Sequence, residues 1–285
     1  MSRLDEIVRA KQREVEALRE STHPGHLRSE GIPSSQDVVG LESRPKAMLK
    51  IAFDARKFGD YGIGTYIRAL LDGFAVHPSQ PSLTLFGLRD GAGRLSIPQN
   101  WSFRSVPYRP YGLGEFFRMG AEVRGSRCDL FHSPHYTVPL SPGIPTIVTV
   151  QDLIQLRFPA IFSPIQRAYA KFMVAHALRT AVLVVTPSEA TKADLVSLFH
   201  AHEHRIKVIP LGVDPAFRPC SQERIDLIRQ KHRLPDRYVL FVGNPKPHKG
   251  IVQLLQAMKT ISRQYNDLSL VIAGGTQVDK TRIHG

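Results

Sequence analysis

The sequence predicts an α/β protein with two units of parallel sheet. Two observations support a complete first unit. Strand-like and helix-like segments alternate from Leu49 to Pro210, and the expected strands are mostly apolar throughout rather than alternating, which is typical of sheets covered on both faces. A third observation, a new strand–turn–helix–strand pattern that begins near Tyr238, predicts the start of a second unit.

The apolar patterns locate each expected element of the first unit. Strands are expected at 49–54, 82–88, 103–106, 129–132, 146–150, 181–186 and 206–210, and helices at 65–75, 114–124 and 164–178. A further helix is expected directly after Ser188, because a serine hydroxyl can accept a hydrogen bond from a free amide of the first helical turn. In the second unit we expect a strand ending at Gly243, a helix from Ile251 and a strand at 268–273.

Composition indicates an ordinary soluble globular protein. Hydrophobic residues make up 42% and charged residues 22% of the 285. The longest apolar runs, such as 146–150, fall far short of the roughly 20 residues that cross a bilayer, and the N-terminus has no apolar signal-peptide core. Cys128 and Cys220 form neither a disulfide framework nor a zinc pattern, which is consistent with a reducing cytoplasm.

The net charge of +13 lies entirely in residues 47–285. Residues 1–46 contain eight basic and eight acidic side chains, whereas the rest contains 30 basic and 17 acidic ones. A solvated basic surface explains this excess, and so does a polyanionic partner such as a nucleotide diphosphate, a nucleic acid or an anionic lipid surface. The absence of known RNA- or DNA-binding motifs argues against nucleic acid.

Four segments follow from these patterns. Residues 1–46 combine an amphipathic helix (2–20) with a Pro- and Gly-containing linker. The remaining three are a first domain at 47–218, a linker at 219–237 and a partial second domain at 238–285. The stretch 214–236 is expected to hold a short helix besides the linker.

A glycine-rich stretch, Gly59 to Gly64, follows the first expected strand. Glycines such as Gly62 and Gly64 let backbone amides approach a ligand closely, and the start of a helix offers unpaired N–H groups to an anion. A tight strand-to-helix turn explains the same glycines equally well.

Six motifs together carry a resemblance to a known family. They are Asp54…Gly-Ile-Gly-Thr-Tyr66, Asp129-Leu-Phe-His-Ser-Pro134, Val148-Thr-Val-Gln-Asp-Leu153, Val185-Thr-Pro-Ser-Glu-Ala-Thr191, Ile209-Pro-Leu-Gly-Val-Asp214 and Phe241-Val-Gly…His-Lys-Gly250. In this order they resemble the family-4 (group 1) retaining glycosyltransferases of GT-B fold, over residues 48 to about 275.

The resemblance implies two Rossmann-like domains, an acceptor on the first and a nucleotide-sugar on the second. It implies sugar transfer to a glycan or lipid-linked acceptor in cell-envelope polysaccharide synthesis, without a metal or other cofactor. Such an enzyme would be cytoplasmic, and the inner face of the plasma membrane is one place where it could act.

Roles for individual residues are carried over from the same resemblance. Catalytic positions are Gln151 and Asp152; donor and diphosphate-binding positions are Gly62, Gly64, Gly243, Lys246 and Lys249; cleft-lining positions are His132, Ser188 and Glu189. Plain alternatives remain: a solvent-facing turn lysine at 249, helix capping at 188 and 189, and a core histidine at 132. No third ligand accompanies His132 and His135, so no metal site is expected.

The sequence departs from the family pattern in three places. Gln151 stands where many members have histidine, and Asn244 stands where the family has arginine. The family's second domain continues for roughly another hundred residues to a glutamate pair, so we expect an incomplete donor site and leave activity open. The alternative is an inactive, truncated member that binds a nucleotide, a membrane or a partner.

Two further patterns are weaker. Between Arg104 and Arg127, arginines alternate with aromatic residues, which suits contact with an anionic membrane but also suits an ordinary helix with one apolar face. Residues 4–18 are similar to the opening helix of indole-3-glycerol phosphate synthase, a pattern that a generic charged helix also produces.

Overall fold

A computed structural model describes residues 49–60, 62–78, 81–88, 97–243 and 249–274. The predicted N-terminal helix and linker lie outside these residues. The chain divides into two compact units. The described part of unit 1 covers 49–157 and 165–214 with the gaps given above, and that of unit 2 covers 158–164 and 215–274 with its gap.

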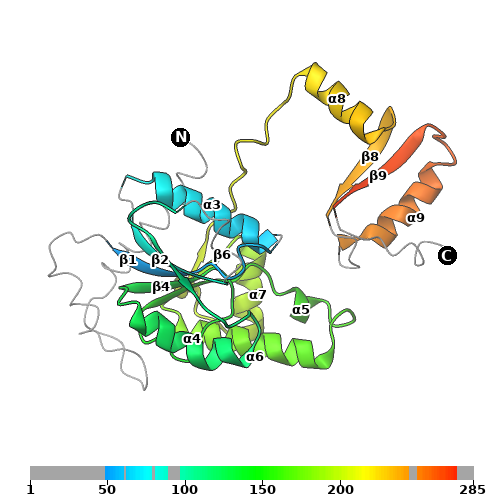
Figure 1. The fold of residues 1–285 in the computed structure, drawn as a ribbon. Coiled ribbons are helices and arrows are strands. Elements are labelled where there is room, and N and C mark those ends of the chain that lie inside the picture. The colour runs from blue at the N-terminus through cyan, green and yellow to red at the C-terminus, as the bar shows by residue number, and fades with distance from the viewer. Residues whose placement is uncertain (1–48, 61, 79–80, 89–96, 244–248, 275–285) are drawn as a thin grey trace. The chain divides into compact units, whose positions relative to one another are not determined.

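Unit 1 contains a seven-stranded, entirely parallel sheet (Figure 1). Its strands, in the spatial order β3-β2-β1-β4-β5-β6-β7, are β3 (Ser102–Ser105), β2 (Ser82–Gly87), β1 (Lys50–Asp54), β4 (Leu130–Ser133), β5 (Thr146–Thr149), β6 (Leu183–Thr186) and β7 (Ile206–Val208). All seven strands expected from the sequence are present, and the parallel sheet is confirmed.

Helices cover both faces of this sheet (Figure 1). One face packs on α3 (Gly62–Val76), and the other packs on α4 (Leu113–Gly125), α6 (Pro164–Thr180) and α7 (Glu189–Phe199). Every residue of β4, β5 and β6 is buried, which is why their sequences are apolar on both faces. The sequence did not predict the short helix α5 (Ile154–Arg157) or the 3-10 turn η2 (Glu203–Arg205).

The strand order reverses at the centre of the sheet. β1 pairs with β2 on one side and β4 on the other, and from there the order runs outward in opposite directions. In open parallel sheets, ligands bind outside the carboxyl ends of the strands near such a reversal. The segments that follow Asp54, Ser133 and Thr149 therefore meet at the edge of unit 1 that can hold a site.

Unit 2 is much smaller. It contains α8 (Gln222–His232), β8 (Arg237–Val242), α9 (Ile251–Ile261) and β9 (Leu268–Ala273), with β8 and β9 paired in parallel. Among its described residues only Ile251 and Met258 are buried hydrophobics, and Leu240 and Val242 on β8 are exposed. The predicted strands and helix are present, and α8 is the short helix expected within 214–236.

Helix α3 begins at Gly62, three residues earlier than expected, so Gly62 and Gly64 lie in its first turn. A Cβ on Gly64 would lie 2.4 Å from the carbonyl oxygen of Phe58, whereas a Cβ on Gly62 would meet nothing within 4 Å. Gly64 therefore lets the helix start pack against the turn that follows β1.

This difference in local space predicts that alanine at the two glycine positions has different effects on the free energy of unfolding. Gly64→Ala should lower the free energy of unfolding by about 1–3 kcal/mol, because the clash with Phe58 shifts the helix start. Gly62→Ala should leave the free energy of unfolding within about 0.5 kcal/mol or raise it, since alanine is the better helix former. Urea unfolding of both variants measures this, and equal destabilisation would contradict the packing role of Gly64.

Candidate functional site

The carboxyl end of β1 carries a buried ion-pair network. The Arg56 side chain, 0% exposed, donates from Nε to Asp54 Oδ1 (2.8 Å) and from Nη2 to Asp54 Oδ2 (2.5 Å). The same Nη2 donates to Glu115 Oε1 on α4 (2.6 Å), and Nη1 donates to the Tyr108 carbonyl (3.2 Å). These contacts tie the end of β1 to the start of α4.

The neighbouring charges keep Arg56 protonated. Burial by itself lowers the pKa of Arg56, but the carboxylates of Asp54 and Glu115 more than offset it, so the pKa lies above its usual value. The second oxygen of Glu115, Oε2, accepts the backbone N–H of Tyr111 at 2.6 Å. Both oxygens of this buried carboxylate are therefore used, as a buried charge requires.

Tyr111 joins this network to a buried lysine. The Lys57 ammonium lies 3.9 Å from the centre of the Tyr111 ring, within the range of a cation–π contact. The same ammonium lies 3.4 Å from Asp60 Oδ2. Tyr111 adopts φ = +68°, which is uncommon for a bulky residue and persists only where surrounding contacts impose it.

His135, after β4, is held neutral beside these cations. Burial, followed by the charges of Lys57 and Arg56, lowers the pKa of His135 well below its ordinary value. The backbone N–H of Thr137 donates to Nδ1 (3.4 Å). Because Nδ1 accepts, the ring proton lies on Nε2, which is 3.4 Å from the Tyr111 hydroxyl and donates to it.

Two more tyrosines pack on the pair of His135 and Tyr111. The Tyr136 ring lies tilted against His135, with ring centroids 3.9 Å apart, and Tyr169 of α6 packs edge-on against Tyr111. Burial raises the pKa of Tyr136, and it raises the pKa of Tyr169 to about 12 together with the neighbouring Glu115 and Tyr111. Both phenols therefore stay protonated at neutral pH.

His132 lies beneath this edge rather than on its surface. Its side chain is 3% exposed, packs edge-on against Phe53 and lies 3.2 Å from Thr149 Oγ1. Thr149 Oγ1 also lies 3.1 Å from the Tyr66 hydroxyl of α3. This matches the alternative of a core histidine, which fixes the ends of β4 and β5.

Gln151 and Asp152 follow the carboxyl end of β5. The Gln151 carbonyl accepts a hydrogen bond from Thr191 Oγ1 (3.2 Å), which fixes its backbone. Its side-chain Nε2 is buried and has no hydrogen-bond partner among the described residues. Asp152 is exposed, and its Oδ1 accepts the Ile154 N–H (3.3 Å) at the start of α5.

Ser188 acts as the predicted helix cap. Its Oγ accepts the Thr191 N–H at 3.2 Å and lies 3.1 Å from Thr191 Oγ1. Glu189, the first residue of α7, is exposed. The capping alternative therefore accounts for the position of Ser188, while Glu189 remains accessible at a helix start.

The predicted donor residues belong to unit 2. Gly243 ends β8 with φ = +144°, and its N–H donates to the Ala273 carbonyl (2.9 Å). A Cβ on Gly274 would lie 3.2 Å from Gly243 N, so two glycines keep this end of the sheet narrow. Lys249 is exposed just before α9. Lys246 lies outside the described residues.

An open pocket of about 850 Å³ lies at the carboxyl edge of unit 1. We call it the Tyr111 pocket. Its lining includes Arg56, Lys57, Asp60, Ser105, Arg109 and Tyr111. Its volume falls within the range of small-molecule sites, about 300–1,000 Å³.

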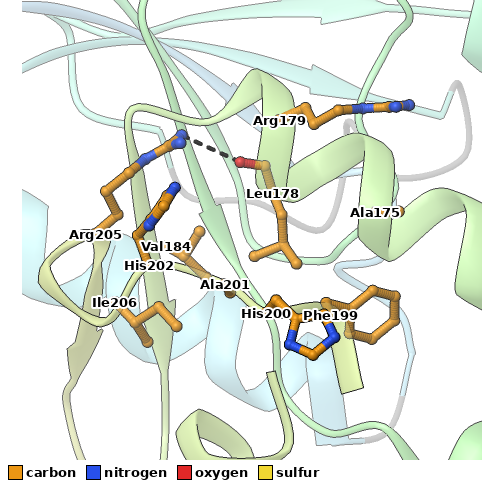
Figure 2. Close-up of a pocket in the computed structure, with 10 residues that line it drawn as sticks. All are labelled: Ala175, Leu178, Arg179, Val184, Phe199, His200, Ala201, His202, Arg205 and Ile206. Atoms are coloured by element: carbon orange, nitrogen blue, oxygen red, sulfur yellow. Dashed lines mark hydrogen bonds between the residues drawn. The ribbon is translucent and has the colours of Figure 1, made fainter. Parts of the chain in front are cut away.

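A smaller pocket of about 300 Å³ lies at the opposite end of unit 1 (Figure 2). It is lined by the ends of α6 and α7 and by Ile206, the first residue of β7. Arg205 donates there to the carbonyls of Leu178 and Ala181, and burial lowers the pKa of Arg205. Since ligands of parallel sheets bind at the carboxyl ends, this pocket does not belong to the candidate site.

The described residues contain no group of three or more His, Cys, Asp or Glu side chains that could hold a metal ion. No helix among them combines the length and apolar character needed to cross a membrane.

Sequence analysis missed the four residues that organise this edge: Arg56, Lys57, Tyr111 and Glu115. One signal was available for two of them. Arg56 and Lys57 follow a buried strand directly and precede the glycine-rich stretch, a position where charged residues meet the ligand edge. Nothing in the sequence indicated that Glu115 and Tyr111 pack against them, because that contact spans more than fifty residues.

Taken together, a parallel α/β unit with a candidate site at its carboxyl edge and a second, smaller parallel unit after it are typical of GT-B-type proteins. Comparison with known sequences gives the family. The profile of Glycosyltransferase Family 4 matches residues 62–217, more than half of the chain, and that of Glycosyl transferases group 1 matches residues 224–284. The chain belongs to Glycosyltransferase Family 4.

Individual relatives agree with this assignment. YtcC of Bacillus subtilis is 28% identical over 222 residues, which cover 74% of this chain and 52% of YtcC. The O-antigen chain mannosyltransferase RfbU of Salmonella typhimurium is 27% identical over 142 residues, covering 50% of this chain and 35% of RfbU. This chain therefore spans about half or less of the length of these relatives.

Solved structures agree on the fold. The crystal structure of Anabaena HepE in complex with UDP and glucose matches with a TM-score of 0.60 and 18% identity, covering 82% of this chain and 63% of HepE. At this identity the match supports the fold alone. It confirms the predicted GT-B-type fold class.

The ion-pair network predicts a large cost for losing its cation. Arg56→Met should lower the free energy of unfolding by about 3–5 kcal/mol, because two buried carboxylates would lose their counter-charge. Arg68→Met is the matched control: Arg68 is exposed on α3 and hydrogen-bonded to Phe58 and Thr65, so its loss should cost about 1 kcal/mol or less. Urea unfolding measures both, and similar costs would contradict the role of Arg56.

Proposed function

We propose that this chain takes part in a retaining glycosyltransferase reaction, in which a sugar passes from a nucleotide-sugar to a glycan or lipid-linked acceptor in cell-envelope polysaccharide synthesis. The observation that carries the proposal is the family match, which runs in order over both units. The chain is 27% identical over 142 residues to an O-antigen chain mannosyltransferase, which supports the cell-envelope assignment.

In this proposal unit 1 binds the acceptor at the carboxyl edge of its sheet. The unpartnered Nε2 of Gln151 supports a ligand-binding role, since a buried donor without a partner costs about 1–3 kcal/mol unless a ligand satisfies it. Gln151 would then donate to an oxygen of the transferred sugar. Asp152 and Glu189, both exposed, would meet hydroxyl groups of the substrates, and Ser188 would fix the helix that carries Glu189.

Unit 2 would hold the nucleotide diphosphate. The departing diphosphate gains negative charge in the transition state, so cations and backbone N–H groups placed near it lower the barrier. Lys249 stands directly before α9, whose free amides and helix dipole favour an anion in the same place. Gly243 would let the backbone approach the phosphates, and Lys246 would add a second cation.

The alternative is a binding module without catalytic activity. If this module binds a nucleotide, unit 2 would hold the diphosphate in the same way. Nucleotide binding therefore tests the donor half of the proposal by itself. Detection of sugar transfer from a bound donor would then distinguish an enzyme from a binding module.

Titration of the whole chain with UDP and GDP at low salt should give binding of one of them. Lys249→Ala should weaken that binding about tenfold, because a charge-assisted contact to phosphate is lost. Lys259→Ala is the matched control, since Lys259 lies exposed in the last turn of the same helix. Calorimetry measures all three proteins, and binding unaffected by Lys249→Ala would refute the donor site.

A peripheral membrane contact is a second element of the proposal. Phe117 of α4 is 63% exposed, and Phe172 and Ile165 of α6 are 51% and 82% exposed. The rings of Phe117 and Phe172 both pack on Phe116, with centroids 5.2 Å and 5.7 Å away. Exposed aromatics of this kind insert at a bilayer interface.

The basic residues near this surface form two groups: some donate to backbone carbonyls, and others are exposed to solvent. Arg104 and Arg124 donate to the backbone carbonyls of Gly125 and Ser141, which limits their part in a membrane contact. Arg118 is exposed beside Phe117 in the sequence, and Lys171 beside Phe172. These two cations would supply the attraction to anionic lipid.

Sedimentation with lipid vesicles tests the membrane contact. The chain should bind phosphatidylglycerol vesicles better than phosphatidylcholine vesicles, and added salt should weaken binding. The double variant Phe117→Ser with Phe172→Ser should reduce the bound fraction several-fold, since apolar area is lost. Val76→Ser, at a position 71% exposed on α3, is the control, and an equal effect of both variants would argue against this surface.

A further inference from the structure

The Tyr111 pocket carries charged and aromatic groups that neither the proposed chemistry nor the membrane contact uses. Among the described residues that line it, Lys57, Arg56 and Arg109 are cationic and Asp60 is acidic. Three observations decide what such a pocket can bind: which of these cations is available, how firmly Tyr111 is held, and which hydrogen-bond donors remain.

The cations have different tasks. The Arg56 guanidinium is fully buried and engaged by Asp54, Glu115 and the Tyr108 carbonyl, so it acts as scaffold. Lys57 is 5% exposed, and its ammonium has one carboxylate neighbour at 3.4 Å and the Tyr111 ring at 3.9 Å. An ammonium has three donors, so Lys57 can serve a further acceptor. Arg109 is exposed in the pocket lining.

Tyr111 is held firmly although it is 49% exposed. Its backbone N–H is fixed by Glu115 Oε2, its ring covers Lys57, and its hydroxyl meets His135. These contacts hold φ at +68°, which a free tyrosine would leave. An aromatic ring held in place at a pocket wall can pack against a sugar ring at little entropic cost.

The hydrogen-bond direction at Tyr111 is also set. Because His135 carries its proton on Nε2, the Tyr111 oxygen accepts from it. The phenolic proton of Tyr111 is then left to donate to another oxygen. The pocket therefore presents an ammonium, a guanidinium and a hydroxyl donor around one fixed aromatic ring.

We propose that the Tyr111 pocket is the acceptor subsite and selects an acidic saccharide, with its phosphate or carboxylate between Lys57 and Arg109 and its ring against Tyr111. This inference rests on the proposed function and narrows the acceptor class within it. The shared chemistry is an anionic group attached to a sugar ring. Phosphorylated and carboxylated sugars both supply it, and the test separates them.

The whole chain is titrated with four probes in the absence of any nucleotide. Ligand-observed NMR measures the binding of each probe. The probes are glucose 1-phosphate, glucuronate, glucose and inorganic phosphate. At least one acidic sugar should bind about tenfold more tightly than both glucose and inorganic phosphate, because charge and ring contacts add. Tighter binding of glucose 1-phosphate assigns a phosphorylated acceptor, and tighter binding of glucuronate assigns a carboxylated one.

Variants locate the binding. Lys57→Met and Arg109→Gln should each weaken the acidic sugar about tenfold, and Lys57→Arg should restore much of the affinity. Tyr111→Asn, which tolerates a positive φ, should remove the preference for the sugar phosphate over inorganic phosphate. Lys207→Met, at an exposed lysine on β7, is the matched loss of charge and should leave the affinity for the acidic sugar unchanged. Should Lys57→Met not fold, Arg109→Gln at the exposed position still decides.

Three results would overturn the inference: equal affinity for glucose and glucose 1-phosphate, no advantage of either acidic sugar over inorganic phosphate, or equal effects of Arg109→Gln and Lys207→Met. These failures are separate from failure of the proposed function. A chain that binds UDP or GDP through Lys249 but no acidic sugar refutes only this acceptor class. A chain that binds an acidic sugar but neither UDP nor GDP refutes the donor half of the proposed function.

Discussion

The buried pairing of Arg56 with Asp54 and Glu115 is the interaction on which the carboxyl edge of unit 1 depends. It sets one guanidinium between two carboxylates at the end of β1 and joins that strand to α4. Through Glu115 it also fixes the backbone of Tyr111, and Tyr111 in turn covers Lys57 and meets His135. Apolar side chains of similar volume in place of the ion pairs could make the fold equally stable. They could not orient Tyr111, Lys57 and His135.

The sheet below this edge explains why the groups meet there. Seven parallel strands bring all their carboxyl ends to one side, and the reversal at β1 and β4 places the segments after them next to each other. Buried pairs such as His132 with Thr149 then fix strand ends against each other. At the same edge, Nε2 of Gln151 has no hydrogen-bond partner in the described part of the chain, as expected where a ligand supplies the missing bond.

The two units differ in how much core supports them. Unit 1 buries three apolar clusters around its sheet, whereas the described part of unit 2 buries two apolar side chains. Sites on well-packed elements hold their geometry better than sites on sparse ones. The proposed acceptor side therefore has a fixed geometry in this chain, and the proposed donor residues Gly243 and Lys249 rest on a strand pair and one helix.

Sequence alone determined the local structure, because apolar runs, glycines and caps act over a few residues: it placed all nine strands found in the described residues, the cap at Ser188 and the family motifs. It also pointed to Gln151, because the motif that contains this residue spans only residues 148–153. Only the tertiary structure decided the strand order, the burial of His132 and the network of Arg56, Lys57, Tyr111 and Glu115. Those contacts join segments about fifty residues or more apart, and no periodic pattern in the chain encodes which distant charges will pair.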